Sequence, residues 1–129
     1  MQKWIVAVEI PSPSTVRYPD PARFTRLLRG KRFLSVDRRG KYILFQVDDG
    51  RVLVVHLRMT GDLLIEPQKT PAHRHTRLRL AFSDGSELRF VDTRRLGQAH
   101  LLRPEEVRIL KGLSNLGPEP LQVRDQDVL

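Results

Sequence analysis

Apolar and polar residues alternate along the central part of the chain with a period of two, which is typical of β-strands. An earlier run, Ile5 to Ile10, is rich in β-branched residues and ends at Pro11, where the prolines of the stretch PSPS remove the backbone donors that a strand needs. Beyond residue 31, short runs are separated by glycine-containing turns such as the one ending at Gly50. The pattern predicts hairpin-connected strands that contain Phe33, Val36, Tyr42, Leu44, Val47, Leu53, Val55, Leu63 and Ile65.

The clearest alternation lies in the segments RLRLAF (residues 77–82) and LRF (residues 88–90). The turn between them contains Asp84 and Gly85, a combination that favours a hairpin. Leucine and phenylalanine point to one side of this hairpin and arginine to the other, because successive side chains of a strand alternate between faces. We therefore expect one face to belong to the core and the opposite face to be basic.

Two short helices are predicted beside the strands. Asp20 is a candidate N-cap followed by proline at the first helical position, and Gly30 can supply the left-handed residue after the last turn, so the first helix is expected over residues 21–29. A second helix is expected from Pro104 to Lys111, ending at Gly112, because the stretch after it is too rich in turn formers for regular structure.

Strands at regular spacing with two peripheral helices favour a mainly β fold, an antiparallel β-sandwich or flattened barrel. The chain is long enough for one core without metals or disulfides. We expect a single domain over residues 1–121 and the start of an interdomain linker over residues 122–129.

The charge balance indicates a polyanionic partner. The chain has 23 Lys and Arg against 15 Asp and Glu, which gives a net charge of +8. Residues 1–103 hold 20 basic and 10 acidic side chains, whereas residues 104–129 hold 3 and 5, so the partner is expected on the first part of the chain. The absence of cysteine excludes a disulfide or thiolate zinc site within the chain. No apolar stretch is long enough for a membrane span, and we expect a cytoplasmic, nucleoid-associated protein.

Four ordered motifs give the chain a family resemblance. They are RGKYILF at residues 39–45, HLRMTG at 56–61, DTRRLG at 92–97 and LGPEPL at 116–121. In this order they resemble the N-terminal domain of the formamidopyrimidine-DNA glycosylase family and of the related endonuclease VIII group. The resemblance extends from about residue 5 to residue 121.

The resemblance implies a function in base-excision repair, with double-stranded damaged DNA as the partner. The family excises oxidised bases, here expected to be purines, and then cleaves abasic sites as an AP lyase. Its N-terminal domain is a β-sandwich joined by a linker to a helix-two-turn-helix domain and usually a zinc finger. Zinc is therefore expected only in a C-terminal part, and no cofactor or metal is expected in this chain.

The front of the chain departs from the family pattern. The family begins with a catalytic Pro-Glu pair and a helix, whereas here the residues up to Trp4 lead directly into the expected first strand. We therefore expect no catalytic residue in this chain and no base excision by the chain alone. Residual lyase chemistry at Lys41 is the alternative. Without that helix, an apolar surface around Trp4 is expected to be exposed and to favour self-association.

The resemblance also implies residue roles. Lys41 lies in the turn that contacts phosphates around the damaged nucleotide, and Arg39 lies in the same basic run; an ordinary solvated lysine is the alternative. His75 and Arg74 match a cationic segment, so phosphate contact is expected there too. The competing interpretation is that His73 and His75 lie on the same side of a strand and bind a metal.

Three further residues match the family's base-probing positions. Met59 lies where a methionine enters the space left by the everted base, with a core methionine as the alternative. Arg94 matches the arginine that reaches the orphaned opposite base, and Leu96 matches the apolar wedge, where the family usually has phenylalanine. Leucine keeps the wedge but loses planar stacking, which is worth about 1–3 kcal/mol per base.

His56 is expected to be a buried histidine with satisfied hydrogen bonds.

Two other classes of function compete with this interpretation. The first is a basic β-domain that binds single-stranded nucleic acid without catalysis, although only 6% of the residues are aromatic and could serve as stacking platforms. The second is an interaction domain derived from the glycosylase fold, whose basic face docks an acidic protein.

Overall fold

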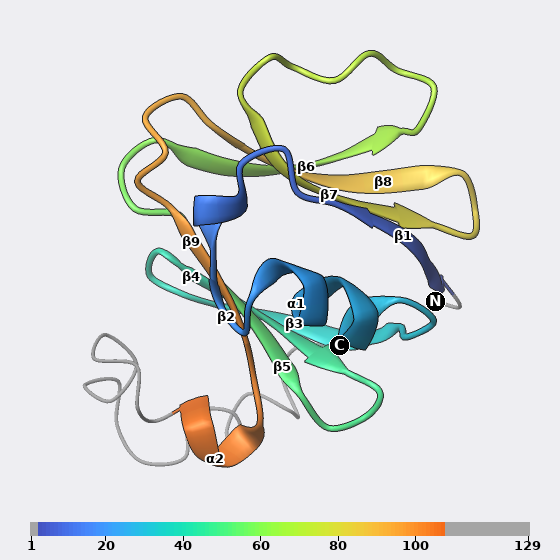
Figure 1. Ribbon diagram of the computed structural model, residues 1–129, viewed down its shortest axis with the longest axis vertical. Helices are drawn as coiled ribbons and strands as arrows, with labels where there is room; N and C mark the ends of the chain where they lie inside the picture. The colour runs from blue at the N-terminus through green and yellow to red at the C-terminus, as the bar shows by residue number, and fades with distance from the viewer. Residues whose placement is uncertain (1–2, 108–129) are drawn as a thin grey trace.

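The computed structural model describes residues 3–107, and the expected linker and the second half of the expected second helix, residues 108–111, lie outside them. The described chain forms nine strands, two α-helices and one short 3-10 helix (Figure 1). The strands are β1 Ile5–Glu9, β2 Val16–Tyr18, β3 Phe33–Arg39, β4 Tyr42–Val47, β5 Val52–His56, β6 Gly61–Pro67, β7 Thr76–Phe82, β8 Ser86–Asp92 and β9 Gln98–Leu102. The helices are α1 Pro21–Leu28, α2 Pro104–Val107 and the 3-10 helix Pro13–Thr15.

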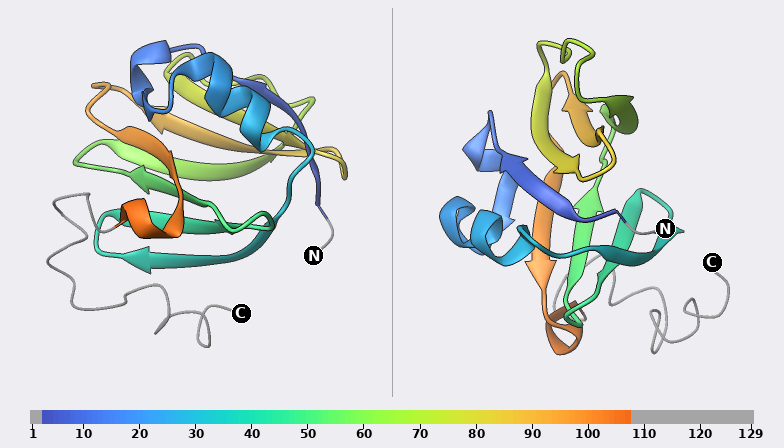
Figure 2. Two further views of the ribbon diagram at one scale, coloured as in Figure 1. Left: turned by 60° about the horizontal axis from the view of Figure 1, so that its bottom comes forward. Right: turned by 90° about the vertical axis from the view of Figure 1, so that its right-hand side faces the viewer.

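The strands form two sheets that pack face to face, which confirms the predicted β-sandwich (Figures 1 and 2). One sheet has the order β1-β7-β8-β6 and the other β2-β9-β5-β4-β3. Neighbouring strands pair antiparallel except for β2, which runs parallel to β9. The parallel pair is possible because α1 and six strands separate β2 from β9 in the chain and provide the crossover.

The first helix has the caps that its sequence predicts. The Asp20 carboxylate accepts a hydrogen bond from the Arg23 N–H at 2.9 Å, and Pro21 occupies the first helical position. Gly30 has a φ of 81° and donates its N–H to the Ile5 carbonyl at 2.8 Å, which ties the end of the helix to β1. Helix α1 lies against β1 of one sheet and β2 of the other, so it closes one open side of the sandwich.

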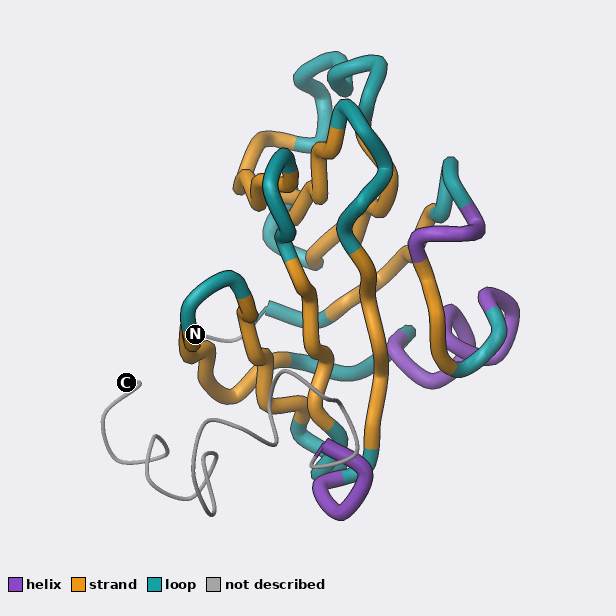
Figure 3. The backbone as a smooth tube through the Cα atoms, turned by 90° about the vertical axis from the view of Figure 1, so that its left-hand side faces the viewer, coloured by secondary structure: helices purple, strands orange, loops and turns teal. Residues whose placement is uncertain are grey.

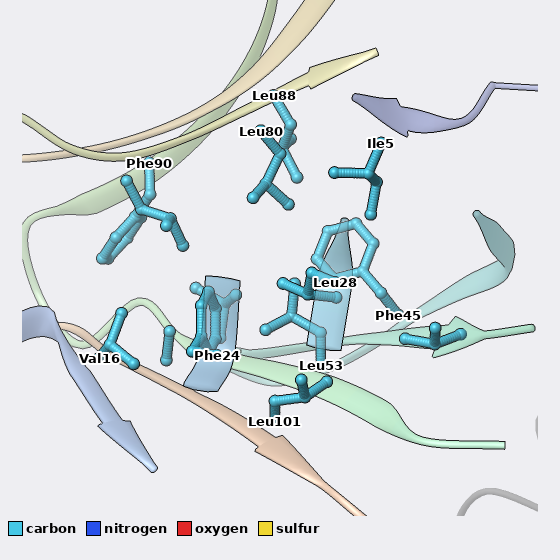
Figure 4. Close-up of a cluster of buried hydrophobic side chains, with 14 of the residues drawn as sticks. Ile5, Val16, Phe24, Leu28, Phe45, Leu53, Leu80, Leu88, Phe90 and Leu101 are labelled. Carbon is cyan, nitrogen blue, oxygen red and sulfur yellow. The ribbon is translucent and has the colours of Figure 1, made fainter. Parts of the chain in front are cut away.

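The core lies between the sheets and under α1 (Figure 4). Leu78, Leu80 and Phe82 of β7 are all at most 5% exposed, which confirms the predicted inward direction of the apolar side chains in this hairpin. Their neighbours in the cluster include Ile5, Phe24, Leu28, Leu53, Leu88, Phe90 and Leu101. At about 25 cal/mol per Å² of apolar surface removed from water, this shared cluster is the main stabilising contribution that joins the two sheets.

The predicted basic face of the β7–β8 hairpin is not an exposed cationic surface. Arg77 and Arg89 are 6% and 2% exposed, and Arg89 donates to the Glu87 carboxylate at 2.8 Å and to the Thr70 carbonyl at 2.6 Å. The segment that follows β6 supplies these carbonyls, so it crosses the face on which the arginines lie. Pairing and carbonyl contacts compensate for the desolvation of these charges.

No helix among the described residues is long and apolar enough to cross a membrane. In the same part of the chain, no group of three or more histidine, aspartate or glutamate residues is arranged to hold a metal ion.

Candidate nucleic-acid interface

The predicted site segments lie in the loops at one end of the sandwich, on the left in Figure 1 and facing the viewer in Figure 3. They are the β3–β4 turn, the β5–β6 loop, the residues just before β7 and the β8–β9 loop. Each is short and begins or ends on a core strand, so the sandwich holds a loop cluster on a rigid base. Figure 1 shows the N-terminal end of β1 on the opposite side of the molecule.

Lys41 occupies the tip of the β3–β4 turn and is exposed. Gly40 before it has a φ of 60°, which lets the hairpin reverse direction. The Lys41 carbonyl accepts a hydrogen bond from the Leu57 N–H at 2.8 Å, which links this turn to the β5–β6 loop. Beneath them, the rings of Tyr42 and His56 stack with centroids 4.1 Å apart.

Arg39 lies in a different setting from its neighbour Lys41. Its Nε is 3.2 Å from Oδ2 of Asp37, and only 16% of its side chain is exposed. The phosphate role of Arg39 stays a prediction, and phosphate binding would have to compete with this ion pair. Lys41 forms no ion pair with any carboxylate of residues 3–107, so it meets the requirement for a phosphate contact more directly.

Met59 projects from the β5–β6 loop and is 78% exposed, so the core-methionine alternative is wrong. Arg58, the residue before it, has a φ of 57°, in the left-handed region that arginine rarely adopts. The Gly61 N–H donates to the Leu57 carbonyl at 2.9 Å and closes the base of the loop. The structure thus presents an unbranched apolar side chain to solvent on a closed turn.

The β8–β9 loop repeats this arrangement. Arg94 and Arg95 are exposed, Arg95 has a φ of 57°, and Leu96 after it is 38% exposed. The Asp92 carboxylate, fully buried at the start of the loop, accepts a hydrogen bond from the Gly97 N–H at 2.6 Å.

Burial opposes ionisation of Asp92, but hydrogen bonds from the Thr60 hydroxyl and from backbone N–H groups of its own loop outweigh this effect and keep its pKa below the ordinary value. The carboxylate is therefore ionised at neutral pH, and its role within the loops is structural.

The structure brings two of the predicted phosphate residues, Arg74 and His75, together with the β8–β9 loop, whereas Lys41 and Arg39 do not line the same hollow. Arg74, His75 and Arg94 line one hollow of about 440 Å³, together with Arg77, Thr93 and Arg95. Arg74, Arg94 and Arg95 are exposed around this hollow and form a concentrated positive site that suits a phosphate group, whereas Arg77 is 6% exposed and already hydrogen-bonded. No DNA contact was predicted for Arg95 from the sequence. Its position next to Arg94 in the motif could have indicated that it lies in the same hollow.

The His75 ring accepts a hydrogen bond from Arg77 in this hollow. Its Nδ1 is 3.1 Å from a guanidinium nitrogen of Arg77, and arginine can only donate, so Nδ1 is the acceptor. Burial, with Arg74, Arg77, His73 and Arg95 as like charges, lowers the pKa of His75 below its ordinary value. A ring that accepts at Nδ1 carries its proton on Nε2, where it can donate to a phosphate oxygen.

Two histidine predictions differ from the structure. His73 and His75 precede β7 and lie in a loop, so the expected strand placement for a metal pair is wrong; their ring centroids are 5.3 Å apart. His56 is only partly buried, and partial burial together with the charge of Arg58 lowers its pKa below the ordinary value. The backbone explains the first difference, because the His75 N–H donates to the His73 ring at 3.0 Å in a turn.

Comparison with known proteins gives relatives that share these motifs. Residues 1–99 match the family described as the formamidopyrimidine-DNA glycosylase N-terminal domain. The formamidopyrimidine-DNA glycosylase of Moorella thermoacetica is 46% identical over 117 residues, which are 91% of this chain and 43% of that protein. The protein of Symbiobacterium thermophilum is also 46% identical, over 88% of this chain and 37% of its own length. The chain thus spans less than half the length of these relatives.

Solved structures agree with the sequence relatives. The Lactococcus lactis glycosylase in complex with DNA containing FAPY-dG has a TM-score of 0.76 at 28% identity, covering 81% of this chain and 39% of that chain. The same protein in complex with DNA containing an abasic site also has a TM-score of 0.76 at 28% identity and the same coverage. From its motifs, its fold and these relatives, the chain belongs to the formamidopyrimidine-DNA glycosylase family and matches the N-terminal domain of that family.

Proposed function

We propose that this chain is the damage-reading N-terminal domain of a base-excision-repair DNA glycosylase and AP lyase that acts on oxidised purines in double-stranded DNA. The observation that carries the proposal is the convergence of the cationic hollow and two loops with exposed apolar tips at one end of the sandwich. The relatives named above are glycosylases, and the similar structures hold damaged or abasic DNA.

The arrangement supplies the two kinds of contact that lesion reading requires. Lys41, Arg74 and His75 can bind phosphates, which fixes the position of the duplex without reading its sequence. Met59 and Leu96 can enter the base stack, where apolar side chains separate neighbouring bases. Arg94 lies beside Leu96 and can reach the base that loses its partner.

We further propose that the chain alone does not excise bases. Asp92, the carboxylate at the centre of the loops, is buried and occupied by hydrogen bonds, so it is unsuited to transferring protons to or from a substrate. Lys41 is the amine in the β3–β4 turn that could attack an abasic sugar. Incubation with abasic DNA and borohydride is expected to give no trapped adduct, and an adduct that disappears with Lys41→Ala would contradict this part of the proposal.

Fluorescence anisotropy of duplex DNA, with and without an abasic-site analogue, tests DNA reading directly. We expect binding that weakens with salt and prefers the analogue. Met59→Ala should remove the preference, and Leu96→Phe should strengthen binding to the analogue by about 1 kcal/mol because it adds planar stacking. Binding that ignores the analogue in the unaltered chain would reject damage reading, and preference for single strands or for acidic proteins would favour the other two classes.

The opposite end of the molecule supports a proposal of self-association. Trp4 and Val6 are 41% and 50% exposed and line a hollow of about 800 Å³ beside α1. Sedimentation velocity is expected to show a dimer that Trp4→Glu disrupts, and a monomer at all concentrations would contradict it. We also propose a cytoplasmic location in contact with the nucleoid, since chromosomal DNA would be the substrate.

A further inference from the structure

One buried carboxylate bonds to both loops that carry the apolar tips. The Thr60 hydroxyl donates to Oδ1 of Asp92, and the Gly97 N–H donates to Oδ2 at 2.6 Å. Thr60 directly follows Met59, and Gly97 directly follows Leu96. A single side chain with no exposed surface therefore joins the two loops immediately beside their apolar tips.

The backbone of Asp92 extends this connection to the cationic hollow. Its N–H donates to the His75 carbonyl at 3.0 Å, and its carbonyl accepts from Nε of Arg77 at 2.8 Å. Arg77 in turn donates to the His75 ring at 3.1 Å. The residue is thus bonded to three of the four segments that form the candidate interface.

The bases of the two loops, at Gly61 and Gly97, both pack against the ring of Phe90. A Cβ atom added to Gly97 would lie 2.3 Å from Cζ of Phe90, and one added to Gly61 would lie 2.7 Å from Cε1 of the same ring. The bases of both loops therefore approach this ring more closely than any residue with a side chain could. Phe90 is 1% exposed and belongs to the core, so the sandwich sets this spacing.

The loops need such restraint because each contains a strained residue. Arg58 and Arg95 both have a φ of 57°, in the left-handed region, where the Cβ of an L-residue crowds the backbone. Each precedes an apolar tip. Without hydrogen bonds at the loop bases, relaxation of these residues would redirect Met59 and Leu96.

We propose that Asp92 is a positioning residue that couples the Met59 loop to the Leu96 loop, so that both apolar tips meet DNA at a fixed spacing. The DNA part rests on the proposed function, whereas the coupling of the loops does not. The carboxylate suits this role because it only accepts hydrogen bonds, and it faces the Thr60 hydroxyl and the N–H groups of Arg94 and Gly97.

Asp92→Asn is the sharpest change, because it keeps the shape but replaces one acceptor with a donor. If the amide oxygen stays on the Gly97 N–H, the new NH2 group faces the Arg94 N–H, which then loses its acceptor. The Thr60 hydroxyl can still accept from this NH2 group, so one link survives in altered form. Asp62→Asn is a matched control, because the Asp62 side chain is exposed at the start of β6 and, among residues 3–107, accepts a hydrogen bond only from the Leu63 N–H, at 3.0 Å.

Amide hydrogen exchange measured by NMR tests the coupling without DNA. We expect Asp92→Asn to raise exchange at Arg94 and Gly97 at least about tenfold, which corresponds to about 1.4 kcal/mol of lost protection. Thr60→Ala changes the β5–β6 loop, but it should raise amide exchange at Gly97 in the β8–β9 loop, because the Asp92 carboxylate connects the two. Thr60→Ser should restore protection. Core amides such as that of Val54 should not change in any variant, because a general loss of stability would raise them too.

The same variants in the anisotropy assay test the consequence for DNA. Asp92→Asn and Thr60→Ala should lose preference for the abasic analogue while keeping salt-dependent binding to intact duplex, and Asp62→Asn should keep both. If Thr60→Ala leaves Gly97 exchange unchanged, or if Asp92→Asn keeps a preference that the unaltered chain shows, the proposal is overturned. If the unaltered chain shows no preference, the proposed function fails, and the exchange results still decide the coupling.

Discussion

The arginines of the four-stranded sheet and those of its neighbouring loops differ in burial and in hydrogen bonding. In the sheet, Arg77 and Arg89 are buried and bonded to a carboxylate, a hydroxyl or backbone carbonyls. In the loops, Arg58, Arg94 and Arg95 are exposed, and no carboxylate of residues 3–107 forms an ion pair with them. A net charge of +8 therefore does not measure the positive charge that is exposed at the candidate interface. The fold buries some arginines in hydrogen bonds and ion pairs and leaves others exposed in the loops.

The largest effect is expected from Arg89→Ala. The substitution removes a buried partner of Glu87 and a donor to the Thr70 carbonyl, so the free energy of unfolding should fall by about 3 kcal/mol. Arg94→Ala is the matched change in a loop and should alter stability by less than about 0.5 kcal/mol. Urea unfolding of both variants measures the contrast, and equal losses would break the division between the two groups of arginine.

A second expected effect depends on pH. Burial opposes ionisation of Glu87, but hydrogen bonds from Arg79 and Arg89 outweigh it and hold its pKa below the ordinary value. A carboxyl with a lowered folded pKa stabilises the protein above its unfolded pKa of about 4.3, and this contribution is lost as pH falls through the folded pKa. The difference in unfolding free energy between the unaltered chain and Glu87→Gln should therefore shrink below about pH 4.3. A difference that stays constant with pH would show that the charge of Glu87 is irrelevant to the sheet.

Arg94→Ala should weaken binding to DNA and leave the free energy of unfolding nearly unchanged. Loss of the guanidinium beside Leu96 is expected to weaken binding to a lesion-containing duplex by about 1–2 kcal/mol, with a smaller effect on intact duplex. Anisotropy titrations with the two duplexes give the ratio. An equal loss on both would mean that Arg94 contacts only phosphate.

The smallest effect is expected from Arg74. Arg74→Ala should weaken binding to intact and damaged duplex alike and lower the slope of log affinity against log salt by about one. Arg74→Lys keeps the charge and should leave this slope unchanged. A slope that changes equally in both variants would indicate that guanidinium geometry, and not charge, determines the contact.

The periodicity of β7 predicted the direction of Leu78, Leu80 and Phe82 correctly, because alternation is a local property of a strand. It could not predict that the segment after β6 crosses the arginine face, since that contact depends on chain distant in sequence. Val36 and Ile65 lay in the predicted strands but are exposed, because each belongs to an edge strand.

Within the site, the family resemblance pointed to the loops that converge. The positive φ of Arg58 and Arg95 had no signal in the sequence, since arginine rarely adopts this conformation. The connections made by Asp92 were equally hidden, because they join residues that are 32 positions apart in the case of Thr60. Sequence motifs could indicate which loops to consider, whereas their mutual restraint required coordinates.

Trp4, the only tryptophan in the sequence, gives one end of the molecule its own fluorescence signal. Its indole lies 5.2 Å from the Arg32 guanidinium, and its backbone bonds to Ser83 in the β7–β8 turn, at the end of β8 opposite Asp92. Its intrinsic fluorescence should therefore report unfolding or self-association at that end and stay unquenched when a duplex occupies the loops. Tryptophan fluorescence can thus monitor the fold of each variant while the anisotropy of a labelled duplex monitors binding in the same sample.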